Sequence, residues 1–228
     1  MTAITASIDR APEENARAEA TRKAILLAAA RVFREDGYSG ARLADIAARV
    51  GMKAGSLYYH FESREALVEA VMDEGLRLTH AAVAERLAAL PSGRDHRRRI
   101  ETAIATHLEM VIAHEDIASA TIKLIWQAPP AIRERQLSRQ RDYGALWKAL
   151  LAEARDADAI RGDLDLSVVR MAIMGALNWA ADWYAPGRMG PREIARDVAA
   201  MILGGLSGHG ATVDDPRMAI AFPDGAEI

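Results

Sequence analysis

The chain of 228 residues contains no cysteine. It therefore has no disulfide framework, no thiolate metal site and no cysteine nucleophile. Aromatic residues are also scarce, at 5% of the chain, but apolar residues of all kinds make up 50% and are enough to fill a core. This composition is compatible with a reducing compartment, and we expect a globular protein of the cytoplasm.

Long apolar runs are missing as well. No stretch approaches the ~18 uninterrupted apolar residues that a membrane span requires. No apolar segment follows a basic start at the N-terminus, as it does in a secretory leader. We therefore expect neither a membrane partner nor export of the chain.

The net charge of −3 is small, but it is unevenly distributed. Residues 17–64 carry nine Lys and Arg against five Asp and Glu, a net charge of +4, so the remainder carries −7. Local charge selects an electrostatic partner, and a basic module on an acidic body is typical of a protein that presents one end to a polyanion. Ordinary solvated surface charge is the alternative explanation.

Apolar residues recur at helical spacing, and no segment alternates apolar and polar residues over the length of a strand. The sequence thus predicts an all-α fold. The ends lack this period, since 1–16 mixes Thr, Ser, Pro, Glu and Asn and 207–228 contains Gly, Pro and Asp, so we expect a disordered arm and a flexible tail. Between them we expect a small N-terminal domain over 17–64 and a larger helical domain over 65–206.

The apolar period and its breaks also place the individual helices. The first helix is expected over 18–36, with Gly37 as its stop. Two short helices follow, and Ser63 is expected to cap a long helix that ends before Pro91. The spans after the first are 43–49, 54–60, 63–90, 94–114, 116–127, 130–155, 165–184 and 191–206.

Two of the short helices meet in the segment 43–57, LADIAARVGMKAGSL. Ala47 is small where the second helix must cross closely, and Gly51 can take the left-handed backbone conformation that reverses the chain. The apolar residues expected to face the core of the pair are Ile46, Val50 and Leu57. This pattern predicts a helix-turn-helix, although a plain helical hairpin has the same spacing.

An aromatic segment, LYYHF over 57–61, follows directly, and SREAL over 63–67 opens the long helix. With Gly37-Tyr38, Asp45-Ile46-Ala47 and Lys53-Ala54-Gly55-Ser56, these parts of 21–72 resemble the DNA-binding domain of the tetracycline-repressor (TetR) family. The resemblance implies an N-terminal three-helix helix-turn-helix DNA-binding domain and a C-terminal helical ligand-binding and dimerisation domain. It also implies a ligand-responsive regulator of transcription.

A recognition helix brings its N-terminal residues to base edges in the major groove and its flanks to phosphates. We expect Lys53 to reach a guanine edge or a phosphate and Ser56 to donate or accept a hydrogen bond, while Ala54 and Gly55 allow close approach. The resemblance implies contacts to the DNA backbone for Tyr58, Tyr59, His60 and Arg64. A core position is the alternative for Tyr58, and Phe61 is expected in the core.

The chain departs from the family at Ala41-Arg42, where Ser or Thr usually caps the second helix and binds a phosphate. That cap is missing here. We expect Arg42 to bind a phosphate through a charge-assisted hydrogen bond instead.

A single recognition helix makes too small an interface for useful specificity, so such domains act in pairs spaced by about 34 Å along the duplex. We therefore expect a homodimer on a palindromic operator of double-stranded DNA. The resemblance implies that the last two helices pair with their twins, and packing within one chain is the alternative. The small and apolar positions expected at the interface are Ala172, Gly175, Ala176, Ala180, Ile194, Val198, Met201 and Ile202.

All four tryptophans lie in the C-terminal half, where large side chains can line a pocket or fill a core. Polar residues embedded in apolar stripes are stronger candidates, because a ligand can supply the partner that a buried polar group needs. The candidate ligand-binding residues are Trp126, Tyr143, Trp147, Arg170, Met174, Asn178 and Trp179. The segment 175–195 resembles TetR regulators of fatty-acid, aromatic-acid and steroid catabolism, which implies an acyl-CoA thioester or another small hydrophobic effector.

The sequence gives little indication of a catalytic site or a metal site. His107 and His114 lie seven residues apart but lack carboxylates in register, and the glycines near 204 follow no strand that would make a phosphate cradle. We expect no enzyme, no metal and no cofactor. The working hypothesis is a repressor that leaves its operator when an effector tilts the helix over 63–90. The alternatives are a ligand-independent activator or architectural DNA-binding protein, and a small-molecule carrier.

Overall fold

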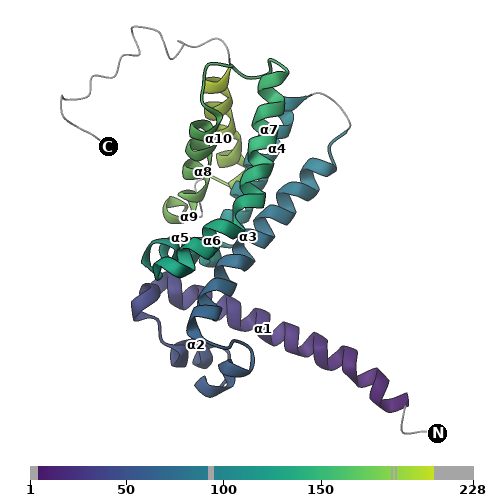
Figure 1. Cartoon of the computed structure of the whole chain (residues 1–228), viewed down its shortest axis with the longest axis vertical. Helices are drawn as coiled ribbons and strands as arrows, with labels where there is room; N and C mark the ends of the chain where they lie inside the picture. Colours follow the sequence, from purple (N-terminus) through teal and green to yellow (C-terminus); the bar gives the residue numbers. More distant parts are fainter. Residues whose placement is uncertain (1–4, 92–94, 186, 188, 208–228) are drawn as a thin grey trace, which may run out of the picture.

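The structure of the chain, a computed structural model, describes residues 5–91, 95–185, 187 and 189–207. Over these residues it contains helices and turns and no strand, as the sequence predicts. In Figure 1, α1 and α2 lie at the lower end, and the long α3 rises from them to the upper helices. The elements in chain order are α1 (Thr5–Gly40), α2 (Leu43–Arg49), the 3-10 helix η1 (Ala54–Tyr59), α3 (Arg64–Ala88), α4 (His96–Ala113), α5 (Glu115–Gln127), α6 (Pro130–Arg139), α7 (Arg141–Asp156), α8 (Leu166–Asn178), α9 (Ala180–Trp183) and α10 (Pro191–Leu206).

Helix α1 begins earlier and ends later than the expected span of 18–36. It starts at Thr5, so the expected disordered arm over 1–16 is helical from that residue on, and residues 1–4 lie outside the described residues. Residues 13–20 are rich in Ala, Glu and Arg, which extend an existing helix without a new nucleation step. Gly37 interrupts the helix where its stop was expected, with φ 69° and ψ −174°, a conformation that is essentially restricted to glycine.

The helix-turn-helix prediction is confirmed in its turn and in its buried residues. Gly51 takes the left-handed conformation with φ 69°, and Ala47 and Leu57 are buried. The second element, however, is the 3-10 helix η1 and not the α-helix expected over 54–60. Hydrogen bonds between residues three apart close both of its ends: the N–H of Ser56 donates to the carbonyl of Lys53 and the N–H of His60 to the carbonyl of Leu57, each at 2.9 Å.

Helix α3 begins where the sequence predicts it. The side chain of Ser63 accepts a hydrogen bond from the backbone N–H of Ala66 at 3.0 Å, which caps the first turn. The helix then continues to Ala88 and spans about 37 Å. It is therefore long enough to contact both ends of the molecule.

Two helices expected to be continuous are divided in the structure. The span 130–155 bends at Gln140 into α6 and α7, and the span 165–184 divides at Trp179 into α8 and α9. The first bend has a packing reason, because Ile132 of α6 and Tyr143 of α7 belong to different apolar cores. The bend thus separates the part of this span that packs into one core from the part that packs into the other.

The buried apolar residues form two clusters, which we call the lower core and the upper core. The upper core joins α4, α7, α8 and α10 and includes Val83 near the end of α3. The lower core joins α1, α2, η1 and the first half of α3 with α5 and α6. The residues that α5, α6 and their connection contribute to the lower core are Ile117, Ala120, Leu124, Ala128 and Ile132. Helices α5 and α6 thus lie between the two ends of the molecule but pack with the lower one (Figure 1).

Helix α10 runs from Pro191 to Leu206, which is the span that the sequence predicts for the last helix. Apart from Ser207, the expected tail over 207–228 lies outside the described residues. None of the helices in the described part of the chain is long and apolar enough to cross a membrane.

Candidate nucleic-acid interface and effector core

The residues expected to read DNA form a tight turn at the lower end of the molecule. We call residues 53–60 the recognition segment. Lys53 caps η1 in an extended conformation, and its carbonyl accepts the N–H of Ser56 at 2.9 Å. Leu57, only 2% exposed, anchors the turn in the lower core. Leu57 thus fixes the segment to the protein on its inner side, while the side chains on its outer side are exposed to solvent.

Most of the expected DNA-contact residues are exposed. Tyr58 is 57% and Tyr59 is 89% exposed, so the alternative of a core position for Tyr58 is wrong, while Phe61 is buried as expected. A Cβ built on Gly55 meets nothing within 4 Å, which leaves room for close approach of a duplex. The other exposed members are Arg42, Lys53 and Ala54, and the half-buried members are Ser56, His60 and Arg64.

Two arginines near the recognition segment lie over aromatic rings. Arg22 donates a hydrogen bond to the carbonyl of His60 at 2.9 Å, and its guanidinium lies 4.2 Å from the centre of the Phe61 ring. The guanidinium of Arg64 lies 4.6 Å from the centre of the Tyr38 ring. Sequence reasoning missed Arg22, because nothing near it in the chain indicates a partner 38 residues away.

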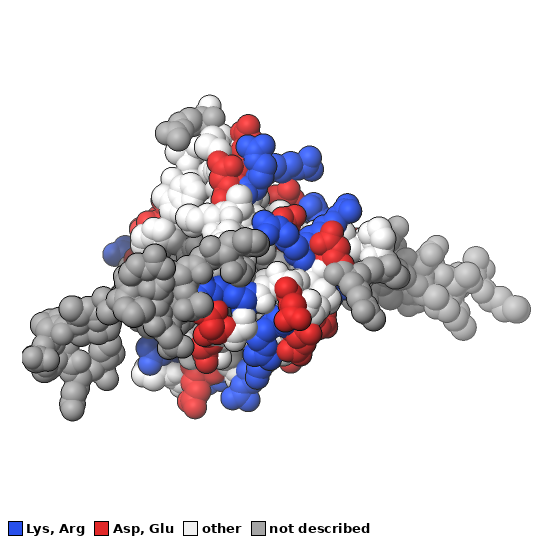
Figure 2. Space-filling view, turned by 90° about the horizontal axis from the view of Figure 1, so that it is seen from above, with Lys and Arg blue, Asp and Glu red and all other residues white. Residues whose placement is uncertain are grey.

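Part of the basic charge of 17–64 is engaged within the protein. Arg31 and Arg34 form ion pairs with acids at the start of α5, and Arg49 pairs with Glu35, whose pKa is lowered mainly by the hydrogen bond from Arg49. Among the described residues no acid pairs with Arg42 or Lys53. Seen from the opposite end of the molecule, acidic and basic side chains alternate without a basic field (Figure 2). Arg42 and Lys53 are thus exposed cations that no described acid neutralises.

Helix α5 is tied to α1 by a set of polar contacts that we call the α1–α5 clamp. Its ion pairs join Arg31 to Asp116 at 2.8 Å and Arg34 to Asp116 at 3.1 Å. At the other end of α5, the Gln127 side-chain oxygen accepts the N–H of Tyr38 at 2.8 Å. The remaining contacts are the Arg34–Glu115 ion pair and the hydrogen bond from Lys123 to the carbonyl of Arg34. Helix α5 is therefore fixed to the DNA-binding end at both of its ends.

Helix α3 is in turn held by α5 and α6. A Cβ added at Gly75 would lie 2.8 Å from the Cγ2 of Ile117, so α3 and α5 approach closely there. Arg139 of α6 pairs with Glu69 and Asp73 of α3 at 2.9 Å each. Burial raises the pKa of Asp73, against the influence of Arg139. Helices α5 and α6 thus both hold the first part of α3.

A polar cluster is made of His107, Tyr143 and Trp147, which are buried in the upper core, and of Asn178, which is exposed at its edge. The hydroxyl of Tyr143 lies 2.7 Å from Nδ1 of His107, and Oδ1 of Asn178 lies 3.0 Å from its Nε2. The Trp147 ring stands edge-on to both His107 and Tyr143. The structure thus brings together three of the seven candidate ligand-binding residues and adds His107.

The hydrogen bonds of this cluster have a defined direction. The Asn178 oxygen can only accept, so Nε2 of His107 carries the proton and Nδ1 accepts the hydroxyl proton of Tyr143. Burial lowers the pKa of His107 to about 4, against the opposing effect of the bond to Asn178, and keeps the imidazole neutral. Burial also raises the pKa of Tyr143 well above its ordinary value, and the nearby Trp147 indole acts in the opposite direction.

The other four candidate ligand-binding residues are distributed differently. Arg170 and Met174 are half-buried and precede Asn178 by two turns and one turn of α8. Trp126 is 75% and Trp179 is 58% exposed, and the structure places neither in the polar cluster. His107 was considered only as a metal ligand, although its place between the buried Ile104 and Leu108 marks it as an embedded polar residue.

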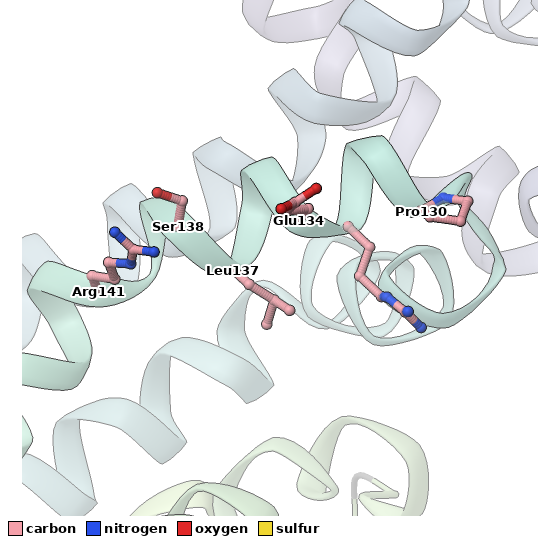
Figure 3. A pocket seen from close by; sticks show the side chains of 6 residues that line it. Pro130, Glu134, Leu137, Ser138 and Arg141 are labelled. Carbon is pink, nitrogen blue, oxygen red and sulfur yellow. The ribbon is translucent and has the colours of Figure 1, made fainter.

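Helix α6 has two contrasting faces. Its inner face buries Ile132 and Gln136, whereas its outer face lines a shallow groove of about 410 Å³ (Figure 3). The residues along this groove are Pro130, Arg133, Glu134, Leu137, Ser138 and Arg141. The groove therefore opens to solvent on the side of α6 opposite to its buried residues.

Helices α8, α9 and α10 each expose large apolar side chains, and we call these exposed side chains together the apolar face. The large apolar side chains exposed on it are Val168, Met171, Trp179, Trp183 and Met201. Of the expected interface residues, Ala172, Gly175 and Met201 are exposed, and Ala176, Val198 and Ile202 are half-buried. Ala180 and Ile194 are buried in the upper core, although Ile194 also lines part of the groove beside α10. A groove of about 490 Å³, lined in part by Trp183 and Val198, continues the face.

Comparison with known proteins agrees with this arrangement. The family model described as "Bacterial regulatory proteins, tetR family" matches residues 25–71, and the model described as "Tetracyclin repressor-like, C-terminal domain" matches residues 93–206. The HTH-type transcriptional repressor KstR2 of Rhodococcus jostii is 26% identical over 188 residues, which cover 82% of this chain and 91% of the relative.

Solved structures share the fold. AibR in complex with isovaleryl coenzyme A and operator DNA superposes with a TM-score of 0.68 at 24% identity, over 79% of this chain and 97% of AibR. The ketosteroid transcriptional regulator KstR2 of Mycobacterium tuberculosis gives 0.69 at 23% identity, over 82% and 95%. With both of its regions matched by family models, the chain belongs to the TetR family of bacterial transcriptional regulators.

Proposed function

We propose that the chain is a homodimeric transcriptional repressor of the cytoplasm that binds a palindromic operator and is released by a small hydrophobic effector, such as an acyl-CoA thioester. Residues 17–64 serve as the DNA-binding domain and residues 65–206 bind the effector and the partner subunit. The observation that carries the proposal is the recognition segment. It exposes Lys53, Tyr58 and Tyr59 at one end of the molecule while Leu57 is anchored in the core.

The chemistry of the recognition segment suits a duplex. Arg42 and Lys53 are exposed and unpaired among the described residues, so each can neutralise a phosphate without first breaking an ion pair. Tyr58 and Tyr59 present rings that contact thymine methyls and hydroxyls that reach phosphate oxygens. Gly55 lets the backbone approach the groove.

The partner is a second copy of the same chain, and the apolar face of α8, α9 and α10 supports this. Met171 and Met201 are 59% and 69% exposed on it, and a contiguous apolar face of this kind is typical of an interaction surface. Ala172 and Gly175 are exposed on the same helix and allow the backbones of two helices to approach. A twofold-symmetric pairing would present two recognition segments to one palindrome.

The effector site is assigned to the polar cluster of His107, Tyr143, Trp147 and Asn178. Support for an acyl-CoA effector comes from the relatives, because AibR has been solved with isovaleryl coenzyme A and operator DNA. A polar cluster that runs from the buried His107 to the exposed Asn178 of an otherwise apolar core also suits a ligand that combines a hydrophobic skeleton with a polar group.

The division into two cores gives the proposal a mechanism. The polar cluster lies in the upper domain next to the bend at Gln140, beyond which α6 packs into the lower core. An effector that opens the cluster displaces the α6–α7 bend and with it α5, which the α1–α5 clamp ties to the DNA-binding end. The two recognition segments of the dimer then no longer match successive major grooves, and operator affinity falls.

The proposal is tested by selecting duplexes from random DNA with the purified protein and measuring their binding by fluorescence anisotropy. Lys53→Ala and Tyr59→Ala are expected to weaken binding of the selected duplex by about 10-fold or more without changing the circular dichroism spectrum. Arg98→Ala is the matched control. It removes an exposed cation at the start of α4 and is expected to change affinity by less than about twofold.

A panel of CoA thioesters added to the protein–DNA complex tests the effector. At least one is expected to raise the operator Kd by about 10-fold or more. A monomeric protein that enriches no duplex at low ionic strength would overturn the proposal, and enrichment without release by any ligand would favour the ligand-independent DNA-binding protein.

A further inference from the structure

The interruption of α1 at Gly37 separates two backbone groups that a continuous helix would join. In an α-helix the N–H of Tyr38 would donate to the carbonyl of Arg34, four residues earlier. With Gly37 at φ 69° and ψ −174°, the N–H of Tyr38 donates instead to Oε1 of Gln127 at 2.8 Å. The carbonyl of Arg34 accepts a hydrogen bond from Nζ of Lys123. Side chains of α5 therefore bind both of the separated groups.

These two side chains come from one face of α5. Lys123 and Gln127 are four residues apart, which is the spacing of neighbours on a helix surface, and both belong to the α1–α5 clamp. The backbone conformation of Gly37 is essentially restricted to glycine and persists only where its surroundings hold it. The position of Tyr38 is thus set by α5 as well as by α1.

The ring of Tyr38 packs against the lower core and also lies beside a positive charge. The guanidinium of Arg64 lies 4.6 Å from the centre of this ring. In the described part of the chain no acid pairs with Arg64, and its Nη2 is buried without a hydrogen-bond partner. A cation is attracted to the negative face of an aromatic ring. The ring of Tyr38 is therefore the group that fixes where this guanidinium lies.

Arg64 stands where an anion is favoured. It is the first residue of α3, the turn that Ser63 caps, and it follows the recognition segment by four residues. The N-terminus of a helix attracts anions and disfavours cations, so an arginine in this turn gains from a bound phosphate. A guanidinium that stacks on a ring keeps N–H donors at its edge, and their planar geometry matches a phosphate.

We infer that Tyr38 is a positioning residue for operator binding: its ring, held in place by α5, keeps the guanidinium of Arg64 where it pairs with a DNA phosphate. The inference rests on the proposed function and deepens it. Displacement of α5 frees the N–H of Tyr38 from Gln127, so the ring and the guanidinium lose their support. The phosphate contact then weakens at the same time as the spacing of the two recognition segments changes.

The salt dependence of operator binding tests the inference. Each neutralised phosphate contributes about 0.9 to the slope of log K against log salt concentration, so Arg64→Ala is expected to lower the slope of a dimer by about 1.8. Tyr38→Leu keeps an apolar side chain against the lower core and removes the ring. It is expected to weaken operator binding by about fivefold and to lower the slope by about 1. Tyr38→Phe keeps the ring and is expected to bind within about twofold of the parent protein.

The double variant Tyr38→Leu/Arg64→Ala separates positioning from packing. It is expected to match Arg64→Ala in operator affinity and in slope, because the ring acts through the guanidinium. An equal loss of affinity from Tyr38→Leu in both backgrounds, or an unchanged slope, would show that Tyr38 only fills the core and would overturn the inference. Normal binding by Tyr38→Leu, or an equal loss in Tyr38→Phe, would overturn it too and leave the proposed function intact. If the parent protein enriches no duplex, the proposed function fails and the inference falls with it.

The link to α5 is tested by Lys123→Met combined with Gln127→Ala. Both residues are exposed, so this variant tests the inference even if Tyr38→Leu does not fold. Loss of Gln127 alone leaves the Lys123 contact, whereas loss of both is expected to weaken operator binding by about fivefold. In the Arg64→Ala background the same pair of changes is expected to cost less than about twofold. Lys148→Met, which removes an exposed cation from α7, is the control, and unchanged operator affinity in the double variant would overturn the inference.

Discussion

Replacing Gly37 and Gln127 by alanine, singly and together, measures the strength of the connection between α5 and the DNA-binding end. An alanine at Gly37 has to adopt φ 69° and ψ −174°, and its Cβ would lie 2.5 Å from Oε1 of Gln127. The backbone strain costs about 1–3 kcal/mol. The Gln127 side chain has to move away, so its bond to the N–H of Tyr38 is lost, at a further cost of about 1 kcal/mol.

The free energies of unfolding are expected to be non-additive. Gly37→Ala is expected to cost about 2–4 kcal/mol and Gln127→Ala about 1 kcal/mol. The double variant is expected to cost no more than Gly37→Ala, because both single changes break the same hydrogen bond. The coupling energy is thus about 1 kcal/mol.

Urea unfolding followed by circular dichroism at a fixed protomer concentration measures these values, since the stability of a dimer depends on concentration. Gln127→Ala is also expected to bind operator DNA normally but to respond less to effector, with the ratio of the two operator Kd values reduced about fivefold. A cost below about 0.5 kcal/mol for Gly37→Ala, or strict additivity of the two changes, would refute the reasoning.

Three further perturbations test other parts of the structure. Gly75→Ala forces α3 and α5 apart at Ile117 and is expected to lower the free energy of unfolding, measured thermally, by about 1–3 kcal/mol. Gly162→Ala is the control and should lower it far less, because an added Cβ meets nothing within 4 Å there. Equal effects would contradict the close approach of α3 and α5. Met201→Asp places a charge on the apolar face of α10 and is expected to give monomers in sedimentation and to abolish operator binding; an intact dimer would remove this face as the interface. His107 has a pKa of about 4 in the folded protein and an ordinary value of 6.5 when unfolded, so between these pH values the unfolded state binds the extra proton. The contribution of His107 to the free energy of unfolding should therefore fall by about 3 kcal/mol as the pH decreases from 6.5 to 4 and stay constant above 6.5. In urea titrations His107→Gln should lose this part of the pH dependence, and an unchanged pH dependence would argue against a buried neutral imidazole.

Features with a local cause were predictable from the sequence. The left-handed Gly51, the cap by Ser63 and the burial of Leu57 and Phe61 all depend on residues within a few positions of one another. The identity of the family could also be inferred, because its motif is contiguous. The same reasoning places the recognition segment but mistakes its 3-10 geometry for an α-helix.

Features that depend on distant residues were not predictable. Arg31 and Asp116 lie 85 positions apart, and Arg31 was counted among the charges available to DNA, since composition does not reveal which cation is already paired. The bend at Gln140 arises because neighbouring turns pack into different cores, a fact that the period of apolar residues does not contain. The network from Tyr143 through His107 to Asn178 joins three helices, so only two of its three members were identified as ligand-site candidates.

The assignment of α5 and α6 to the lower core bears on the engineering of hybrid repressors. A sensor exchange made at residue 64 would cut through a single apolar cluster, because Ile117, Leu124 and Ile132 complete the packing around Phe33 and Met72. The first 64 residues, transplanted alone, would carry an uncovered apolar surface and depend on the new host to fill it. A chimera that retains residues 65–72 and 115–139 with the DNA-binding end keeps the buried residues of this cluster together. The boundary for modular exchange is therefore set by which residues pack together and not by one point along the chain.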